Sequence, residues 1–138
     1  MKFAVDWLTD HLDTRLNDHK IIDKLTNIGL EVESFENQTS EFDDFIVAKI
    51  ISAEKHPNAD KLNVCKVFDG KNTFSVVCGA PNVKLGMKSV FANIGTYIPG
   101  LNLKLKKGKI RGEESFGMLC SEKELTLSEN HNGIIELD

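Results

Sequence analysis

The sequence lacks the short motifs that mark many catalytic and metal sites. It contains no Walker loop, no GxGxxG, no HExxH, no CxxC pair and no paired metal-binding carboxylates. No apolar run approaches the roughly 18 residues that a membrane span requires. An aspartate at position 6 interrupts the N-terminus before the apolar part of a secretory signal can form. We therefore expect a cytoplasmic chain without a catalytic centre, a metal site or a membrane contact.

Cysteine is scarce and its spacing suits neither zinc nor redox chemistry. Cys65, Cys78 and Cys120 are odd in number, far apart and surrounded by apolar neighbours. Free cysteine is among the most buried residue types, so we predict buried thiols in a reducing compartment. A cysteine-dependent enzyme is the alternative, and it requires Cys78 or Cys120 to be exposed in an electropositive setting beside His56.

Positive charge is concentrated in the middle of the chain, although the net charge is −4. Residues 1–45 carry 4 basic and 11 acidic side chains, residues 46–112 carry 12 and 3, and residues 113–138 carry 1 and 7. The three segments therefore have net charges of −7, +9 and −6. Five cations crowd into eight residues of the basic segment: Lys104, Lys106, Lys107, Lys109 and Arg111. This density is typical of a phosphate-binding surface.

The same basic run has an alternating pattern. Leucines at positions 101, 103 and 105 alternate with polar residues at 102, 104 and 106. The alternation predicts a strand with its leucines in a core and its lysines on one outer face. A solvated edge strand that resists aggregation is the alternative interpretation.

The first 38 residues predict a small α/β segment. An apolar stripe at positions 21, 22, 25 and 28 predicts a helix over 19–28, with Asp18 as its N-cap and Gly29 as its C-terminal stop. Residues 7–12 suggest a short first helix, and apolar residues at 30, 32 and 35 suggest a strand. A unit of this size seldom folds alone, so its apolar stripe should pack on further structure.

The rest of the chain is mainly β. After a polar linker at 39–44, strands are predicted at 45–53, 62–68, 74–78, 89–94, 101–110, 117–120 and 134–137. Turn residues separate them densely, as at 56–60 and 79–82. Closely spaced short strands favour a closed or nearly closed antiparallel barrel, and the OB-fold is a frequent small solution. We expect one such domain over residues 45–138.

Several sequence blocks resemble the N-terminal part of bacterial phenylalanyl-tRNA synthetase β subunits. The similarity runs through Leu25-Thr26-Asn27-Ile28-Gly29-Leu30-Glu31-Val32-Glu33, His56-Pro57-Asn58-Ala59-Asp60-Lys61-Leu62, Val76-Val77-Cys78-Gly79-Ala80-Pro81-Asn82, Lys109-Ile110-Arg111-Gly112 and Ser115-Phe116-Gly117-Met118-Leu119-Cys120-Ser121-Glu122. The region from 45 onward also resembles the EMAP-II-type tRNA-binding domain. The resemblance implies an OB-fold that binds tRNA by backbone and shape, preceded by part of a winged-helix-like domain that later sequence completes.

The resemblance also implies a larger enzyme. Members of the family that the chain resembles are ATP- and Mg²⁺-dependent phenylalanine-tRNA ligases. They are α2β2 tetramers, in which the α subunit and the remainder of the β subunit hold the catalytic sites. We expect no cofactor in these residues, tRNA as the partner and no DNA. A stand-alone OB-fold protein-interaction module or chaperone-like dimer is the alternative, and steep salt dependence of binding would distinguish the tRNA-binding function from it.

Matching positions in the resemblance, together with the basic run, identify the candidate RNA contacts. These are His56, Asn58, Lys61, Asn82, Lys104, Lys106, Lys109, Arg111, Ser115, Met118 and Ser121. Arg111 is the strongest candidate, since a guanidinium binds phosphate bidentately and the next residue, Gly112, lets RNA approach closely.

Structural roles are the alternatives for several of these candidates. His56 and Asn82 also suit turns, Met118 suits a core, and Ser115 and Ser121 suit caps. Few aromatics belong to the expected surface: Phe91, Tyr97 and Phe116, which also suit a core. Base stacking is therefore expected to matter less than phosphate and shape recognition.

Overall fold

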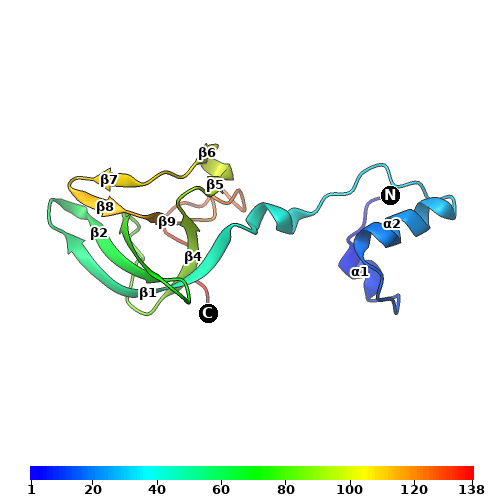
Figure 1. Ribbon diagram of the computed structural model, residues 1–138, viewed down its shortest axis with the longest axis horizontal. Coiled ribbons are helices and arrows are strands. Elements are labelled where there is room, and N and C mark those ends of the chain that lie inside the picture. The colour runs from blue at the N-terminus through cyan, green and yellow to red at the C-terminus, as the bar shows by residue number, and fades with distance from the viewer. The chain divides into compact units, whose positions relative to one another are not determined.

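The computed structural model describes residues 1–138, apart from the side chains of residues 38 and 39. The chain divides into two compact units, Met1–Gln38 and Thr39–Asp138, which Figure 1 shows as a helical and a β-rich part. Among the described residues, no helix has the length and apolar character needed to cross a membrane.

The first unit contains two helices, α1 (Val5–Thr9) and α2 (Asp18–Asn27). The α2 N-cap is Asn17, whose side chain accepts a 3.0 Å bond from the Lys20 N–H, so the prediction of Asp18 as N-cap is wrong by one residue. Gly29 has the predicted left-handed conformation, with a φ of +92°, and closes the helix. The predicted strand at 30–35 is wrong, because the first unit offers it no partner strand among its described residues.

A 3₁₀ helix (Gln38–Phe42) lies where the two units meet in the sequence, and the second unit is built on a five-stranded antiparallel sheet. Its strands are β1 (Phe45–His56), β2 (Ala59–Phe68), β3 (Thr73–Cys78), β4 (Lys88–Asn93) and β9 (Gly117–Leu119), in the order β3-β2-β1-β4-β9. A bond of 2.8 Å from the Phe116 N–H to the Ser75 carbonyl brings the two edges of the sheet together. This nearly closed barrel confirms the predicted OB-fold.

The length of β1 explains how one strand serves two neighbours. Phe45 to Lys49 pair with β4, while Lys49 to His56 pair with β2, and the register shifts between Ile50 and Ser52. Such a bulge bends a strand and lets a sheet curl on itself. Side chains inside the curl are fully buried, among them Ile50, Val67 and Phe91.

A long excursion joins β4 to β9 and carries the basic run (Figure 1). It comprises β5 (Tyr97–Ile98), a 3₁₀ helix (Pro99–Leu101), β6 (Leu103–Lys104), β7 (Gly108–Ile110) and β8 (Glu113–Ser115). The single predicted strand at 101–110 is therefore wrong, and so is the burial of its leucines: Leu101 and Leu103 are 48% and 43% exposed. Pro99 opens a 3₁₀ turn and Asn102 is left-handed, with a φ of 50°, which interrupts the extended chain.

The last predicted strand is also wrong as an element. Residues 134–137 contribute one isolated bridge, between Lys88 and Leu137, instead of a ladder. The segment is held by single backbone bonds, including one of 2.9 Å from the Ile135 N–H to the Cys120 carbonyl. It covers the barrel core, where Ile134 is buried.

Candidate nucleic-acid interface

The β7–β8 hairpin presents the end of the basic run at a tight turn. Ile110 pairs with Glu113, leaving Arg111 and Gly112 as the two turn residues. Both have positive φ, 49° and 100°, as a type I′ turn requires. Glycine adopts this conformation freely, whereas Arg111 is held in it by the hairpin. The turn leaves Lys109 and Arg111 exposed.

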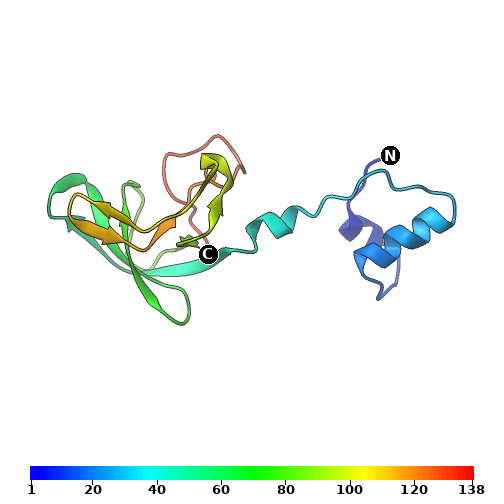
Figure 2. The same ribbon diagram turned by 45° about the horizontal axis from the view of Figure 1, so that its top comes forward.

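A small hydrogen-bond network fastens this turn to the turn between β1 and β2. His56 is buried, with 4% of its surface exposed. Its Nε2 atom lies 3.0 Å from the Ile110 carbonyl oxygen, and its Nδ1 atom accepts a 3.0 Å bond from the Asn58 N–H. Because Nδ1 is an acceptor, the imidazole proton lies on Nε2, which donates to Ile110. The Asn58 amide donates to the Arg111 carbonyl at 3.2 Å. We call His56, Asn58 and their two backbone partners the hairpin latch; both ribbon views show the two turns side by side (Figures 1 and 2).

Most cations of the basic run, and Lys61 of β2, are exposed without an ion pair to a described residue. Lys61, Lys104, Lys106, Lys109 and Arg111 all have exposed side chains, and none forms an ion pair with a described residue. Lys107 differs, since it pairs with Glu114 at 2.8 Å and lies 4.6 Å from the centre of the Phe116 ring. The Lys107 ammonium, through its hydrogen bond and its charge, lowers the pKa of the Glu114 carboxyl. We call residues 104–115, which contain the β7–β8 hairpin and the lysines that lead into it, the basic hairpin. The basic hairpin therefore keeps most of its positive charge available for an external anion.

Two further predicted contacts make internal hydrogen bonds. Asn82 donates to the Ile134 carbonyl at 2.8 Å and accepts from the Ile134 N–H at 3.0 Å, so one amide ties two distant loops together. Ser115 is buried; its hydroxyl donates to the Gly117 carbonyl at 3.0 Å and accepts from the Val77 N–H at 3.1 Å. These bonds fasten β8 to β3 where the barrel closes. Direct RNA contact by either side chain stays a prediction.

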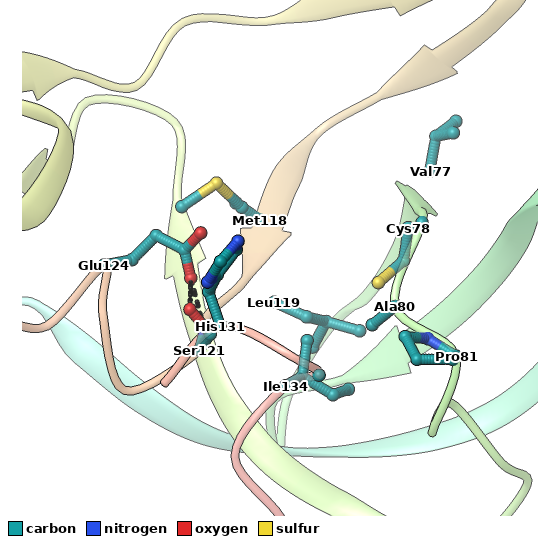
Figure 3. A pocket seen from close by; sticks show the side chains of 12 residues that line it. Val77, Cys78, Ala80, Pro81, Met118, Leu119, Ser121, Glu124, His131 and Ile134 are labelled. Atoms are coloured by element: carbon teal, nitrogen blue, oxygen red, sulfur yellow. Dashed lines mark hydrogen bonds between the residues drawn. The ribbon is translucent and has the colours of Figure 1, made fainter. Parts of the chain in front are cut away.

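Met118 and Ser121 line a pocket of about 310 Å³ on another part of the barrel (Figure 3). Ser121 is buried, and its N–H and hydroxyl both donate to Oε2 of Glu124. His131 also lines the pocket, next to Glu124 in Figure 3. Sequence reasoning missed Glu124 and His131, although glutamate three residues after serine is the spacing of a capping box.

The aromatic and sulfur side chains lie mostly inside. Phe91 is fully buried and Phe116 is partly buried, while Tyr97 is 50% exposed. All three cysteines are buried, as predicted, and burial raises the pKa of both Cys65 and Cys120 to about 12 and raises that of Cys78. A cysteine-dependent enzyme required Cys78 or Cys120 to be exposed in an electropositive setting beside His56, and both thiols are buried.

Comparisons with known proteins agree with this architecture. Residues 45–138 match the family described as "Putative tRNA binding domain". The chain is similar to proteins named phenylalanine--tRNA ligase beta subunit: 55% identical over 139 residues to that of Rhodopseudomonas palustris, 53% over 138 residues to that of Paramagnetospirillum magneticum, and 51% over 139 residues to that of Mesorhizobium japonicum. These matches cover 99%, 100% and 99% of this chain, which spans 17% of each relative's length.

Proposed function

Because the chain belongs through residues 45–138 to this family of tRNA-binding domains, we propose that it binds tRNA through the basic hairpin and the turn latched to it. The cations at 104, 106, 109 and 111, together with Lys61 of β2, contact phosphates. Recognition depends on backbone and shape, because lysine and arginine bind phosphate without reading a base. Expected affinities are about 1–100 μM at physiological salt.

The observation that carries the proposal is the availability of these charges on a supported element. A flexible cationic loop would lose conformational entropy on binding RNA, which reduces affinity. The latch bonds from His56 and Asn58 hold the hairpin turn before RNA arrives. The OB-fold commonly binds nucleic acid between the loop after its first strand and the loop before its last. In this chain these are the two connections that the latch joins.

We assign supporting roles to three members of the predicted site whose polar atoms bond within the chain. His56 orients the hairpin, Ser115 fastens the strand that follows it, and Asn82 holds the loop before β4 against Ile134. His56 acts on RNA binding through the position of the hairpin turn, whereas Ser115 and Asn82 act on the stability of the barrel. This assignment separates residues whose loss reduces stability from residues whose loss reduces phosphate attraction.

For the whole protein we propose a β subunit of a cytoplasmic phenylalanine-tRNA ligase. The names and 51–55% identity of the relatives support this proposal. The attachment of phenylalanine, with ATP, Mg²⁺ and an α subunit in an α2β2 tetramer, belongs to the parts of the enzyme outside these residues. The present domain supports that reaction by holding tRNA.

The test is tRNA binding by the 138-residue chain at several salt concentrations. Replacing Lys104, Lys106 and Lys109 together with alanine should weaken binding and reduce the slope of log K against log salt by about 1 per lost phosphate contact. Thermal unfolding should change little, because all three side chains are exposed. A matched control replaces Lys84, Lys88 and Lys123, which removes the same charge outside the hairpin.

The hairpin variant should lose tRNA affinity, and the control variant should lose less. Equal losses in both would mean that net charge, not the hairpin, attracts the RNA. Unchanged binding in the hairpin variant would place the RNA surface elsewhere. Binding that is insensitive to salt would favour a protein-interaction module instead.

A further inference from the structure

The pocket beside β9 has a composition unlike that of the basic hairpin. Its lining mixes apolar and polar groups, and Leu119 and Ile134 lie between Met118 on one side and Pro81 on the other (Figure 3). Its polar groups are Glu124, Ser121 and His131. A carboxylate here disfavours a phosphate, so the pocket is not a continuation of the phosphate surface.

The Glu124 carboxylate has one oxygen in use and one available. Oε2 accepts from both the N–H and the hydroxyl of Ser121, which fixes the orientation of the carboxylate. Among the described residues none donates to Oε1, which points away from Ser121 in Figure 3. A fixed, partly buried acceptor beside apolar side chains favours a planar ligand that has an apolar face and offers an N–H donor.

We propose that this pocket holds an unpaired RNA base with an exocyclic amino group, such as cytosine. The base would lie against the Met118 thioether and the apolar side chains beside it, and its amino group would donate to Oε1 of Glu124. Glutamate accepting from cytosine N4 is an established pairing chemistry. The volume of about 310 Å³ is sufficient for one base. Uracil presents a carbonyl oxygen at the same position, so the carboxylate should reject it.

The inference rests on the proposed RNA-binding function and adds base preference to it. β9 follows β8 after the single residue Phe116, so the pocket begins on the strand next to the basic hairpin. An RNA whose phosphates lie along the hairpin could place one unstacked base in the pocket. Phosphate attraction would then provide affinity, and the pocket would provide selectivity.

The experiment compares fluorescent oligo(C) and oligo(U) of equal length with the 138-residue chain at moderate salt. We expect oligo(C) to bind about tenfold more tightly, the ratio typical of one charge-assisted hydrogen bond. Glu124→Gln should abolish or reverse this preference, since glutamine can still accept from Ser121 while its NH₂ group replaces Oε1. The matched control is Glu122→Gln, which makes the same charge change on the same loop, outside the pocket.

A second measurement does not depend on a variant. With ¹³C-labelled methionine methyl groups, free cytidine should shift the signal of Met118, which lines the pocket, more than that of buried Met87. Uridine should have a smaller effect. An equal response to both nucleosides, or no response by Met118, would overturn the proposal.

The outcomes separate this inference from the function on which it depends. Salt-dependent tRNA binding with equal oligo(C) and oligo(U) affinities would refute the base pocket and leave the hairpin surface intact. Absence of any tRNA binding would refute both. A third outcome also refutes the proposal. If the chain binds an arginine amide, Glu124→Gln abolishes that binding and oligo(C) and oligo(U) bind equally, then the pocket takes a protein side chain.

Discussion

The hairpin latch can be tested by separating the two bonds of His56. Replacing His56 with alanine removes the bond to Ile110 and the bond from Asn58, and leaves a cavity where a 4%-exposed ring was packed. Two lost hydrogen bonds of about 1 kcal/mol each, together with lost packing, predict a destabilisation of about 2–4 kcal/mol. Denaturant unfolding measures this change directly.

Two conservative variants divide the effect. His56→Asn can keep an acceptor near the position of Nδ1 for the Asn58 N–H, whereas His56→Gln can keep a donor near the position of Nε2 for the Ile110 carbonyl. Both should destabilise the barrel, but the glutamine variant alone should keep the β7–β8 hairpin protected from amide hydrogen exchange. It should also bind tRNA more tightly than the asparagine variant, by about fivefold if ordering the hairpin costs about 1 kcal/mol.

The test compares, for each variant, the amide hydrogen exchange of the β7–β8 hairpin with the affinity for tRNA. If the asparagine and glutamine variants protect the hairpin equally, the bond to Ile110 does not hold it. If hairpin protection falls while tRNA affinity stays at the level of the unaltered chain, preorganisation does not contribute to binding. Either result would refute the proposed role of His56.

Two further predictions concern the Asn82 amide and the buried thiols. Asn82→Ala should lower the free energy of unfolding by about 2–4 kcal/mol, because the Ile134 backbone loses both of its bonds to the Asn82 amide. The tRNA affinity of the folded chain should change little. Reduced affinity without a change in stability would assign Asn82 to RNA contact. For Cys65 and Cys120, burial raises the folded pKa from 9.0 to about 12, so thiol ionisation in the unfolded chain should lower stability as pH rises from 9 towards 12. Urea midpoints at pH 8 and 10.5 should therefore differ less in a Cys65→Ala, Cys120→Ala variant, and an equal difference would contradict the burial of these thiols.

The barrel strands were predictable where pairing and burial repeat regularly. Residues 45–53, 62–68 and 74–78 were all identified as strands, although β1 continues to His56 and β2 begins at Ala59. The extensions are the part where the two strands approach their turn. Alternation of side chains weakens there, so local sequence gives little indication of the hydrogen-bonded ladder.

The basic run shows where periodicity misleads. Its alternating leucines satisfied the pattern of a strand, but Pro99 and the left-handed Asn102 make a 3₁₀ turn and a two-residue strand instead. Leu105 alone of the three leucines packs against a core cluster. The exposure of the lysines was nevertheless predicted, because charged side chains avoid burial in either geometry.

The pocket was beyond sequence reasoning because its parts converge from distant segments. Pro81 follows β3, Met118 belongs to β9, and Glu124 and His131 come from the loop after β9. Their proximity depends on barrel closure and on the Asn82 bonds to Ile134. Residue type alone indicated a core position for Met118 and a cap for Ser121, and both descriptions agree with part of what these side chains do.

The motif residues and the cations perform different work in this domain. His56, Asn82 and Ser115 direct their polar atoms at backbone groups, and each of these bonds joins two segments that are distant in the sequence. Among the described residues, the exposed lysines at 61, 104, 106 and 109 have no such bonds and can follow an irregular phosphate backbone. A rigid frame with mobile charges suits a folded RNA, because the frame fixes where the positive potential lies while the side chains adapt to individual phosphates.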